Sequence, residues 1–155
     1  IMAYEALYVL DSGNLVVANN LASLLTTHRE DAESLERAYI IGRRLRGRDI
    51  APFQDTYGWI AYLRGNYEEA LSHLRPASAG LPNDPAVQYH LAMTFAAMER
   101  NEEALAQFEK TAELVGTGEQ PRFMGVVIKE IERLTSSLSP REGLTVNGTT
   151  EGEGN

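Results

Sequence analysis

The side chains that could carry acid–base or metal chemistry are few and scattered. The three histidines, His28, His73 and His90, lack the spacing of metal ligands. The acidic pairs at 68–69 and 102–103 stand at expected helix starts, where carboxylates stabilise the helix dipole. Cysteine is absent, so thiol nucleophiles, thiolate zinc sites and disulfides are excluded. No phosphate loop or nucleophile elbow is present. We therefore expect no enzyme activity, no catalytic residue, no metal and no cofactor.

The most informative pattern is an internal repeat. Ala70 and Ala104 are 34 residues apart, and so are Gly58 and Ala92. The stretches 67–71 and 101–105 read almost alike, as YEEAL and NEEAL. A fixed period of this length is typical of stacked repeats, in which each unit buries its apolar face against its neighbours. Such folds offer an extended binding surface, so the repeat favours binding over catalysis.

The units follow from the helical periodicity and the turn residues. Residues 51–84 predict a helix, a break at Gly65, a second helix starting at Asn66 with Glu69 as its capping-box partner, and a loop. Residues 85–118 repeat this plan, with Asp84 as a candidate cap. Residues 15–50 follow it less regularly, and 1–14 read as the end of a preceding repeat. On this interpretation the chain begins within a longer array.

The C-terminal part predicts a cover for the last repeat. A helix over 119–138 has an apolar stripe, including Phe123 and Ile131, and a charged opposite face. The composition of 139–155 predicts a flexible tail, with a weak hairpin signal over 144–150 and a glycosylation sequon at Asn147. Within the second helix of the central unit, Pro76 predicts a kink.

The repeat resembles the tetratricopeptide repeat. The family's pattern of small and aromatic positions is matched in the two regular units by Tyr57-Gly58, Ala61, Ala70, Leu74 and Pro82, and by Leu91-Ala92, Phe95, Ala104 and Phe108. The family's first aromatic is replaced by Gln54 and Gln88, and its terminal proline by Gly116 in the second unit. Two runs, 19–22 and 55–59, are also similar to bacterial members. The resemblance implies an all-α, right-handed α-solenoid of antiparallel helix pairs with a C-terminal capping helix.

Small side chains are expected where paired helices cross, because larger ones would force the helices apart at about 1–3 kcal/mol per site. The expected packing positions are Ala22, Gly58, Ala70, Ala92 and Ala104, together with the aromatic Phe108.

The resemblance also implies that the first helices line a concave groove for a peptide or partner segment. The groove positions are Asn19, Asn20, Ser23, Asp55, Trp59, Tyr62, Tyr89, His90 and Met93. Their aromatic members suit an interface floor, although Trp59 could instead pack between repeats. Asn20 could hold a peptide backbone or bond to the adjacent repeat. A clamp for a terminal carboxylate is not expected, since His90 is the sole candidate cation among the corresponding positions.

The net charge of the chain limits the classes of partner that it can bind. The formal net charge of −8 disfavours nucleic acid and anionic lipid. No apolar run reaches the roughly 20 residues that span a bilayer. The absence of cysteine is compatible with both cytoplasm and periplasm. We expect a non-catalytic scaffold that binds a protein or peptide in its groove, with a hydrophobic or basic partner favoured. The alternatives are a self-association module forming a homo-oligomer, and a regulatory domain of an enzyme whose catalytic part lies outside these residues.

Overall fold

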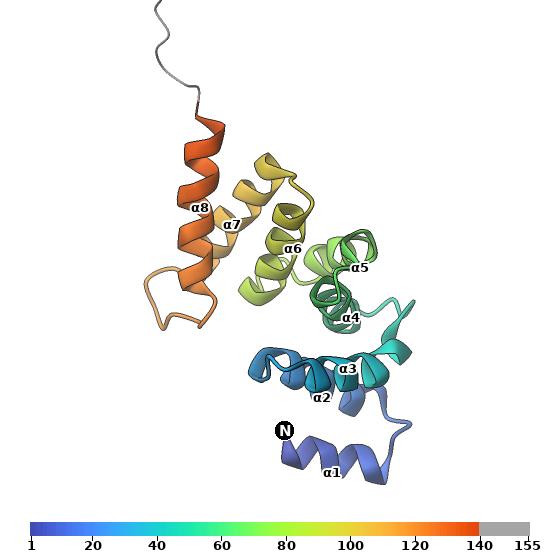
Figure 1. Ribbon diagram of the computed structural model, residues 1–155. Coiled ribbons are helices and arrows are strands. Elements are labelled where there is room, and N and C mark those ends of the chain that lie inside the picture. The colour runs from blue at the N-terminus through green and yellow to red at the C-terminus, as the bar shows by residue number, and fades with distance from the viewer. Residues whose placement is uncertain (140–155) are drawn as a thin grey trace, which may run out of the picture.

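The computed structural model describes residues 1–139, and this part of the chain is entirely helical (Figure 1). The expected hairpin, sequon and all but the first residue of the expected tail lie outside the described residues. The helices are α1 (Met2–Leu10), α2 (Leu15–His28), α3 (Ala32–Gly42) with a 3-10 turn at Arg43–Leu45, α4 (Ala51–Leu63), α5 (Tyr67–Gly80), α6 (Pro85–Ala97), α7 (Asn101–Val115) and α8 (Met124–Leu138).

Three helices begin at side-chain caps that the local sequence supplies. Asn14, Asp31 and Asp84 accept hydrogen bonds from backbone N–H groups in the first turns of α2, α3 and α6. The predicted cap at Asp84 is therefore confirmed. The predicted capping box of Asn66 and Glu69 is wrong, because the Asn66 side chain makes no capping hydrogen bond. The Glu69 carboxylate instead accepts a hydrogen bond from the Tyr57 hydroxyl.

Two further expectations concern the start of the C-terminal helix and the effect of Pro76. The C-terminal helix begins at Met124, so 119–123 form a turn rather than the first turns of the predicted capping helix. Pro76 lies inside α5, which continues to Gly80. Pro76 is exposed and the helix is not interrupted there, so the kink stays a prediction.

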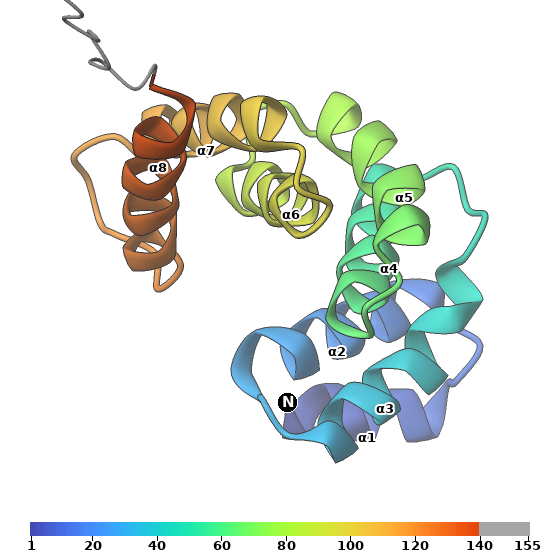
Figure 2. The same ribbon diagram turned by 45° about the horizontal axis from the view of Figure 1, so that its top comes forward.

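The helices are arranged as a curved stack (Figures 1 and 2). Successive pairs, α2 with α3, α4 with α5 and α6 with α7, pack side by side, and α8 packs on α7. In Figure 2 the helices α2, α4 and α6 lie on the inner side of the curve, with α5 and α7 outside. The inner side is therefore built mainly from the first helix of each pair.

Small side chains lie where the helices meet. Ala22, Ala70, Ala92 and Ala104 have no exposed surface. A Cβ placed on Gly58 would lie 2.7 Å from Cγ of Leu74, so α4 and α5 approach too closely there for any side chain. Phe108, also completely buried, belongs to the main core cluster, which extends from Ala61 in α4 to Leu134 in α8. A second cluster joins α1, α2, α3 and α4.

Gln88, which stands in place of the family's aromatic residue, is also completely buried. Its Oε1 accepts a hydrogen bond from Ser78 Oγ at 2.6 Å and another from Gln107, and its Nε2 donates to the Leu81 carbonyl at 2.9 Å. Because every polar atom of the buried amide has a partner, Gln88 ties α5, α6 and α7 together without an unpaired polar group.

A candidate partner-binding pocket on the concave side

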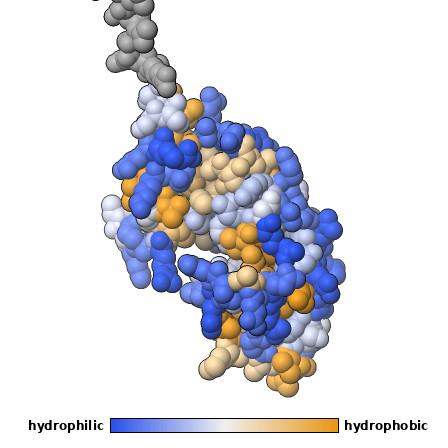
Figure 3. Space-filling model, in the orientation of Figure 1, coloured by the Kyte–Doolittle hydropathy of each residue, from blue (hydrophilic) through white to orange (hydrophobic). Residues whose placement is uncertain are grey.

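A pocket of about 460 Å³ opens on the inner side of the curve. Figure 3 shows a notch in this part of the surface, between the turn that leads into α8 and the end of α2. We call this the concave pocket; it is lined by Ser23, Thr26, Thr27, Glu30, Asp55, Trp59, Asp84, Ala86, Val87, Tyr89, His90, Arg122 and Phe123. Its walls come from α2, α4, α6 and the turn before α8, which are far apart in the sequence.

A larger but more open depression of about 990 Å³ lies around the start of α5, with Arg46 and Met98 at its edge. Arg46 and Glu69 already form an ion pair there at 2.9 Å. We favour the concave pocket as the candidate site because its surface is more enclosed and carries several aromatic rings.

Trp59 lies at the centre of an aromatic group that faces the pocket. Its indole stacks on the Tyr62 ring at 4.6 Å and 5° from parallel, and on the His90 ring at 4.2 Å and 17°. The Trp59 side chain is half-buried, and its N–H donates to no acceptor within residues 1–139. Since that nitrogen is not among the buried polar atoms without a partner, it is open to solvent and to a ligand acceptor.

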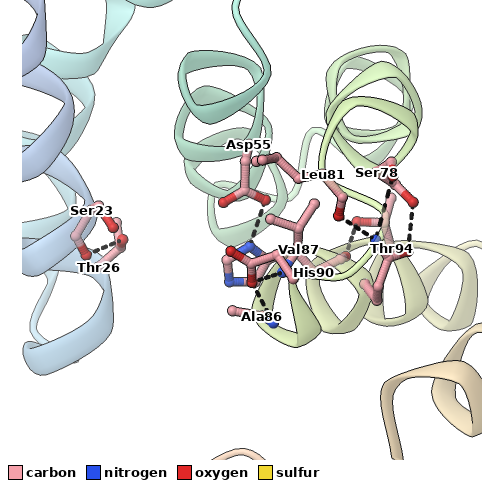
Figure 4. Close-up of polar contacts among 11 residues, drawn as sticks. Ser23, Thr26, Asp55, Ser78, Leu81, Ala86, Val87, His90 and Thr94 are labelled. Atoms are coloured by element: carbon pink, nitrogen blue, oxygen red, sulfur yellow. Dashed lines mark hydrogen bonds and ion pairs between the residues drawn. The ribbon is translucent and has the colours of Figure 1, made fainter. Parts of the chain in front are cut away.

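Asp55 and His90 join two neighbouring repeats across the pocket floor. The Nδ1 of His90, on α6, donates a hydrogen bond to Oδ1 of Asp55, on α4, at 2.8 Å (Figure 4). Each side chain is only 16% exposed, so both groups are largely withdrawn from water. A carboxylate can only accept, which places the ring proton on Nδ1. The second oxygen of Asp55 has no partner in the described residues, and like the Trp59 N–H it is open to solvent.

The C-terminal wall is also aromatic. The rings of Tyr89 and Phe123 stack at 4.7 Å and 11° from parallel. Burial raises the pKa of the Tyr89 phenol to about 12, with smaller contributions from Tyr62 and from the Glu130 carboxylate. Tyr89 therefore presents a neutral ring at physiological pH.

The facing wall is polar and comes from α2 (Figure 4). The Thr26 hydroxyl donates to the carbonyl of Ser23 at 3.0 Å, so it is bonded within its own helix. Together with Asp55 and the aromatic rings, this wall makes a pocket with one polar and one apolar side, which suits a segment of mixed character.

Of the nine groove residues expected from the sequence, the pocket brings together Ser23, Asp55, Trp59, Tyr89 and His90. Tyr62 and Met93 are half-buried and pack against the main core cluster instead. The two asparagines lie deeper in α2. Asn20 donates to the Tyr4 hydroxyl in α1 at 3.1 Å, and the Oδ1 of Asn19 is buried without a partner within residues 1–139. The Asn20 amide therefore bonds to the preceding helix, the alternative left open above.

Sequence reasoning missed several residues of the pocket wall, among them Glu30, Asp84, Arg122 and Phe123. Glu30 and Arg122 come from loops, Asp84 was assigned only as a cap, and Phe123 was assigned only to an apolar stripe. Their positions depend on the curvature of the whole stack, so a repeat pattern could not have found them. For Phe123 the sequence offered one indication, namely a large aromatic residue just before the last helix.

Two other possibilities for the described part of the chain are a metal site and a membrane-spanning helix. No three His, Asp or Glu side chains within 1–139 gather closely enough to hold a metal ion. None of the described helices combines the length and apolar character needed to cross a membrane.

Comparison with known proteins agrees with the helical repeat fold. Residues 61–115 match the family model of the tetratricopeptide repeat. No curated protein sequence matches the chain significantly. Among solved structures, the type III secretion translocator chaperone SycD of Yersinia enterocolitica superposes with a TM-score of 0.61 at 17% identity, covering 84% of this chain and 92% of SycD. SycD in complex with a peptide of the translocator YopD superposes with a TM-score of 0.59 at 16% identity, covering 82% of this chain and 98% of SycD.

At such low identity these structures establish the fold alone. The family match lies on the two helix pairs in which the repeat is most regular, and the superpositions extend over most of the chain. Residues 61–115 thus match the tetratricopeptide repeat family, and the described part of the chain, residues 1–139, has an all-helical fold like that of SycD.

Proposed function

We propose that this chain is a non-catalytic scaffold that holds a segment of a partner protein in the concave pocket. The observation that carries the proposal is the group of aromatic rings around Trp59, which line an enclosed hollow between neighbouring repeats. Aromatic side chains with an accessible polar edge are the residues that most often anchor protein interfaces.

Further support comes from the fold and from a relative. One chaperone that shares this fold was solved in complex with a peptide of a translocator protein. In the present chain, the Trp59 N–H and one oxygen of Asp55 have no hydrogen-bond partner among the described residues and are not buried. Such groups can bond to the backbone or side chains of an incoming segment.

The test is to select binders from a random peptide library displayed on phage, using the intact chain as bait. Trp59 is the sole tryptophan, so synthetic peptides without tryptophan should change its fluorescence on binding. Truncating a central aromatic anchor should weaken binding strongly, so we expect Trp59→Ala to raise the Kd of labelled peptides by about tenfold or more.

Tyr39→Ala is the matched control, because Tyr39 is a half-buried aromatic on α3 outside the pocket. Fluorescence anisotropy of labelled peptides should give nearly the wild-type Kd for this variant. Selected peptides that bind equally well to Trp59→Ala would place the binding surface elsewhere, and failure to select any peptide would remove the proposal.

A second candidate function, self-association, is favoured by the outer face of α1. Met2, Val9 and Leu10 are 86%, 78% and 83% exposed. Figure 3 shows hydrophobic surface at the lower end of the molecule, where α1 lies in Figure 1. Exposed apolar side chains on one helix are typical of an interface, and a second copy of the chain could cover them.

Light scattering over a concentration series tests this candidate. If copies associate through α1, the mean mass should rise with concentration and Val9→Glu should keep the chain monomeric, because a buried unpaired carboxylate opposes association. Lys129→Glu on the exposed surface of α8 is the control. A monomer at all concentrations would argue against self-association.

A further inference from the structure

We propose that the segment held in the concave pocket carries a lysine or arginine whose charge is bound by Asp55, next to an apolar side chain that packs on Tyr89 and Phe123. This inference rests on the proposed function and adds to it the chemical class of the partner.

The first argument is the state of Asp55. The Asp55 side chain is only 16% exposed, and within residues 1–139 its sole ion-pair candidate is the imidazole of His90. An imidazole balances a carboxylate only when it is protonated. A largely desolvated carboxylate is stabilised by a cation, and the open oxygen of Asp55 leaves one hydrogen-bonding position for it.

The second argument is the charge of the pocket wall. Three carboxylates, from Glu30, Asp55 and Asp84, face the pocket, against one guanidinium, from Arg122. Neither Glu30 nor Asp84 forms an ion pair within the described residues. The pocket is therefore negative when His90 is neutral, and it favours a positive side chain over an acidic one.

The third argument is the apolar wall beside Asp55. Tyr89 and Phe123 stack on each other, and the Tyr89 ring centroid lies 5.8 Å from that of Trp59. These rings lie within reach of the residues adjacent to a bound cation, and they also offer apolar surface to the methylene groups of a lysine or arginine. A segment that combines a basic and an apolar side chain thus matches both the charge and the surface of the pocket.

The experiment continues the selection described above. Peptides selected on the wild-type chain should be enriched in lysine or arginine relative to the unselected library. For a selected peptide, we replace the basic residue by its neutral isostere, norleucine for lysine or citrulline for arginine. This change should raise the Kd for the wild-type chain by about tenfold.

The matching protein variant is Asp55→Asn, which removes the charge but keeps an acceptor for the Nδ1–H of His90. In a double-mutant cycle, the neutral peptide should lose little further affinity for Asp55→Asn, because the two changes remove the same interaction. Glu109→Gln makes the same change of charge at an exposed position of α7 outside the pocket, and it should leave the Kd and the preference for basic residues unchanged.

The outcomes separate the two proposals. Peptides that depend on Trp59 but show no enrichment in basic residues would overturn the charge assignment and leave the proposed scaffold function intact. The charge assignment would also be overturned if neutralising the peptide lowered its affinity for Asp55→Asn as much as its affinity for the wild-type chain. If no peptide binds in a Trp59-dependent manner, both proposals fall.

Discussion

Replacing Phe108 by alanine should lower the free energy of unfolding by about 3–5 kcal/mol, the range found for buried aromatic truncations. Phe108 is the largest of the completely buried side chains. It lies in the cluster that joins α4 through α8, so the cavity left by the ring would loosen several helices at once. Because the total stability of a domain of this size is typically about 5–15 kcal/mol, the variant should lose a large share of its stability.

Urea denaturation followed by circular dichroism of the helices measures this effect. Val126→Ala is the control, because Val126 lies on α8 with 39% of its surface exposed. That substitution should change the free energy of unfolding by no more than about 0.5 kcal/mol. Hydrogen exchange should show the loss first in α7 and α8, which pack on each other at the end of the stack. A loss below about 1 kcal/mol for Phe108→Ala would contradict the packing described here.

The second large effect is expected for Gly58→Val, which should destabilise the chain by about 2–3 kcal/mol through overpacking. An added Cβ would lie 2.7 Å from Cγ of Leu74 and 3.2 Å from Cβ of His73. Both neighbours belong to α5, so the two helices of the pair would have to separate. The equivalent position in the next unit is Ala92, a small residue that is completely buried.

Gly125→Val is the matched control, because a Cβ at Gly125 in α8 meets no other atom within 4 Å. It should be neutral or slightly stabilising, since valine is a better helix former than glycine. The double variant Gly58→Val/Leu74→Ala should lose less free energy of unfolding than the sum of the two single losses, because alanine vacates the space that the new valine needs. If the losses measured in thermal or urea melts simply add, the two side chains do not contact each other.

The partner-binding predictions depend on this packing. Trp59 follows Gly58 on α4, and Asp55 lies one turn earlier on the same helix. A shift of α4 away from α5 would therefore displace the anchor and the carboxylate together. For this reason, Gly58→Val should weaken peptide binding even where it leaves the chain folded.

The sequence alone determined the helical pairs and the small residues at which they meet. The 34-residue period placed Gly58, Ala70, Ala92 and Ala104 where paired helices cross, because helical periodicity and small residues act over short stretches of chain. The Asp84 cap was predictable for the same reason, since the backbone N–H groups of Ala86 and Val87 that donate to its carboxylate lie within three residues. That Leu74 is the side chain facing Gly58 came from the tertiary structure.

Where a side chain had competing partners, only the tertiary structure decided the outcome. Glu69 leaves the expected capping box because the Tyr57 hydroxyl, at 3.1 Å, and the Arg46 guanidinium reach its carboxylate. The Asn20 amide donates to the Tyr4 hydroxyl of the preceding helix, whereas the sequence left open that it would hold the backbone of a bound peptide. Such choices depend on distances between helices, and a single sequence does not contain those distances.

The same distinction applies to the concave pocket. The resemblance to the tetratricopeptide repeat implied that Asp55, Trp59 and His90 lie on the groove-lining helices, and all three line the concave pocket. The tertiary structure decided that Phe123 and Arg122 complete the wall, and that Tyr62 and Met93 do not line this pocket but pack, half-buried, against the core cluster. The physical reason is that small rotations between successive helix pairs add up along the stack, and this accumulated curvature brings residues nearly one hundred positions apart to the same pocket.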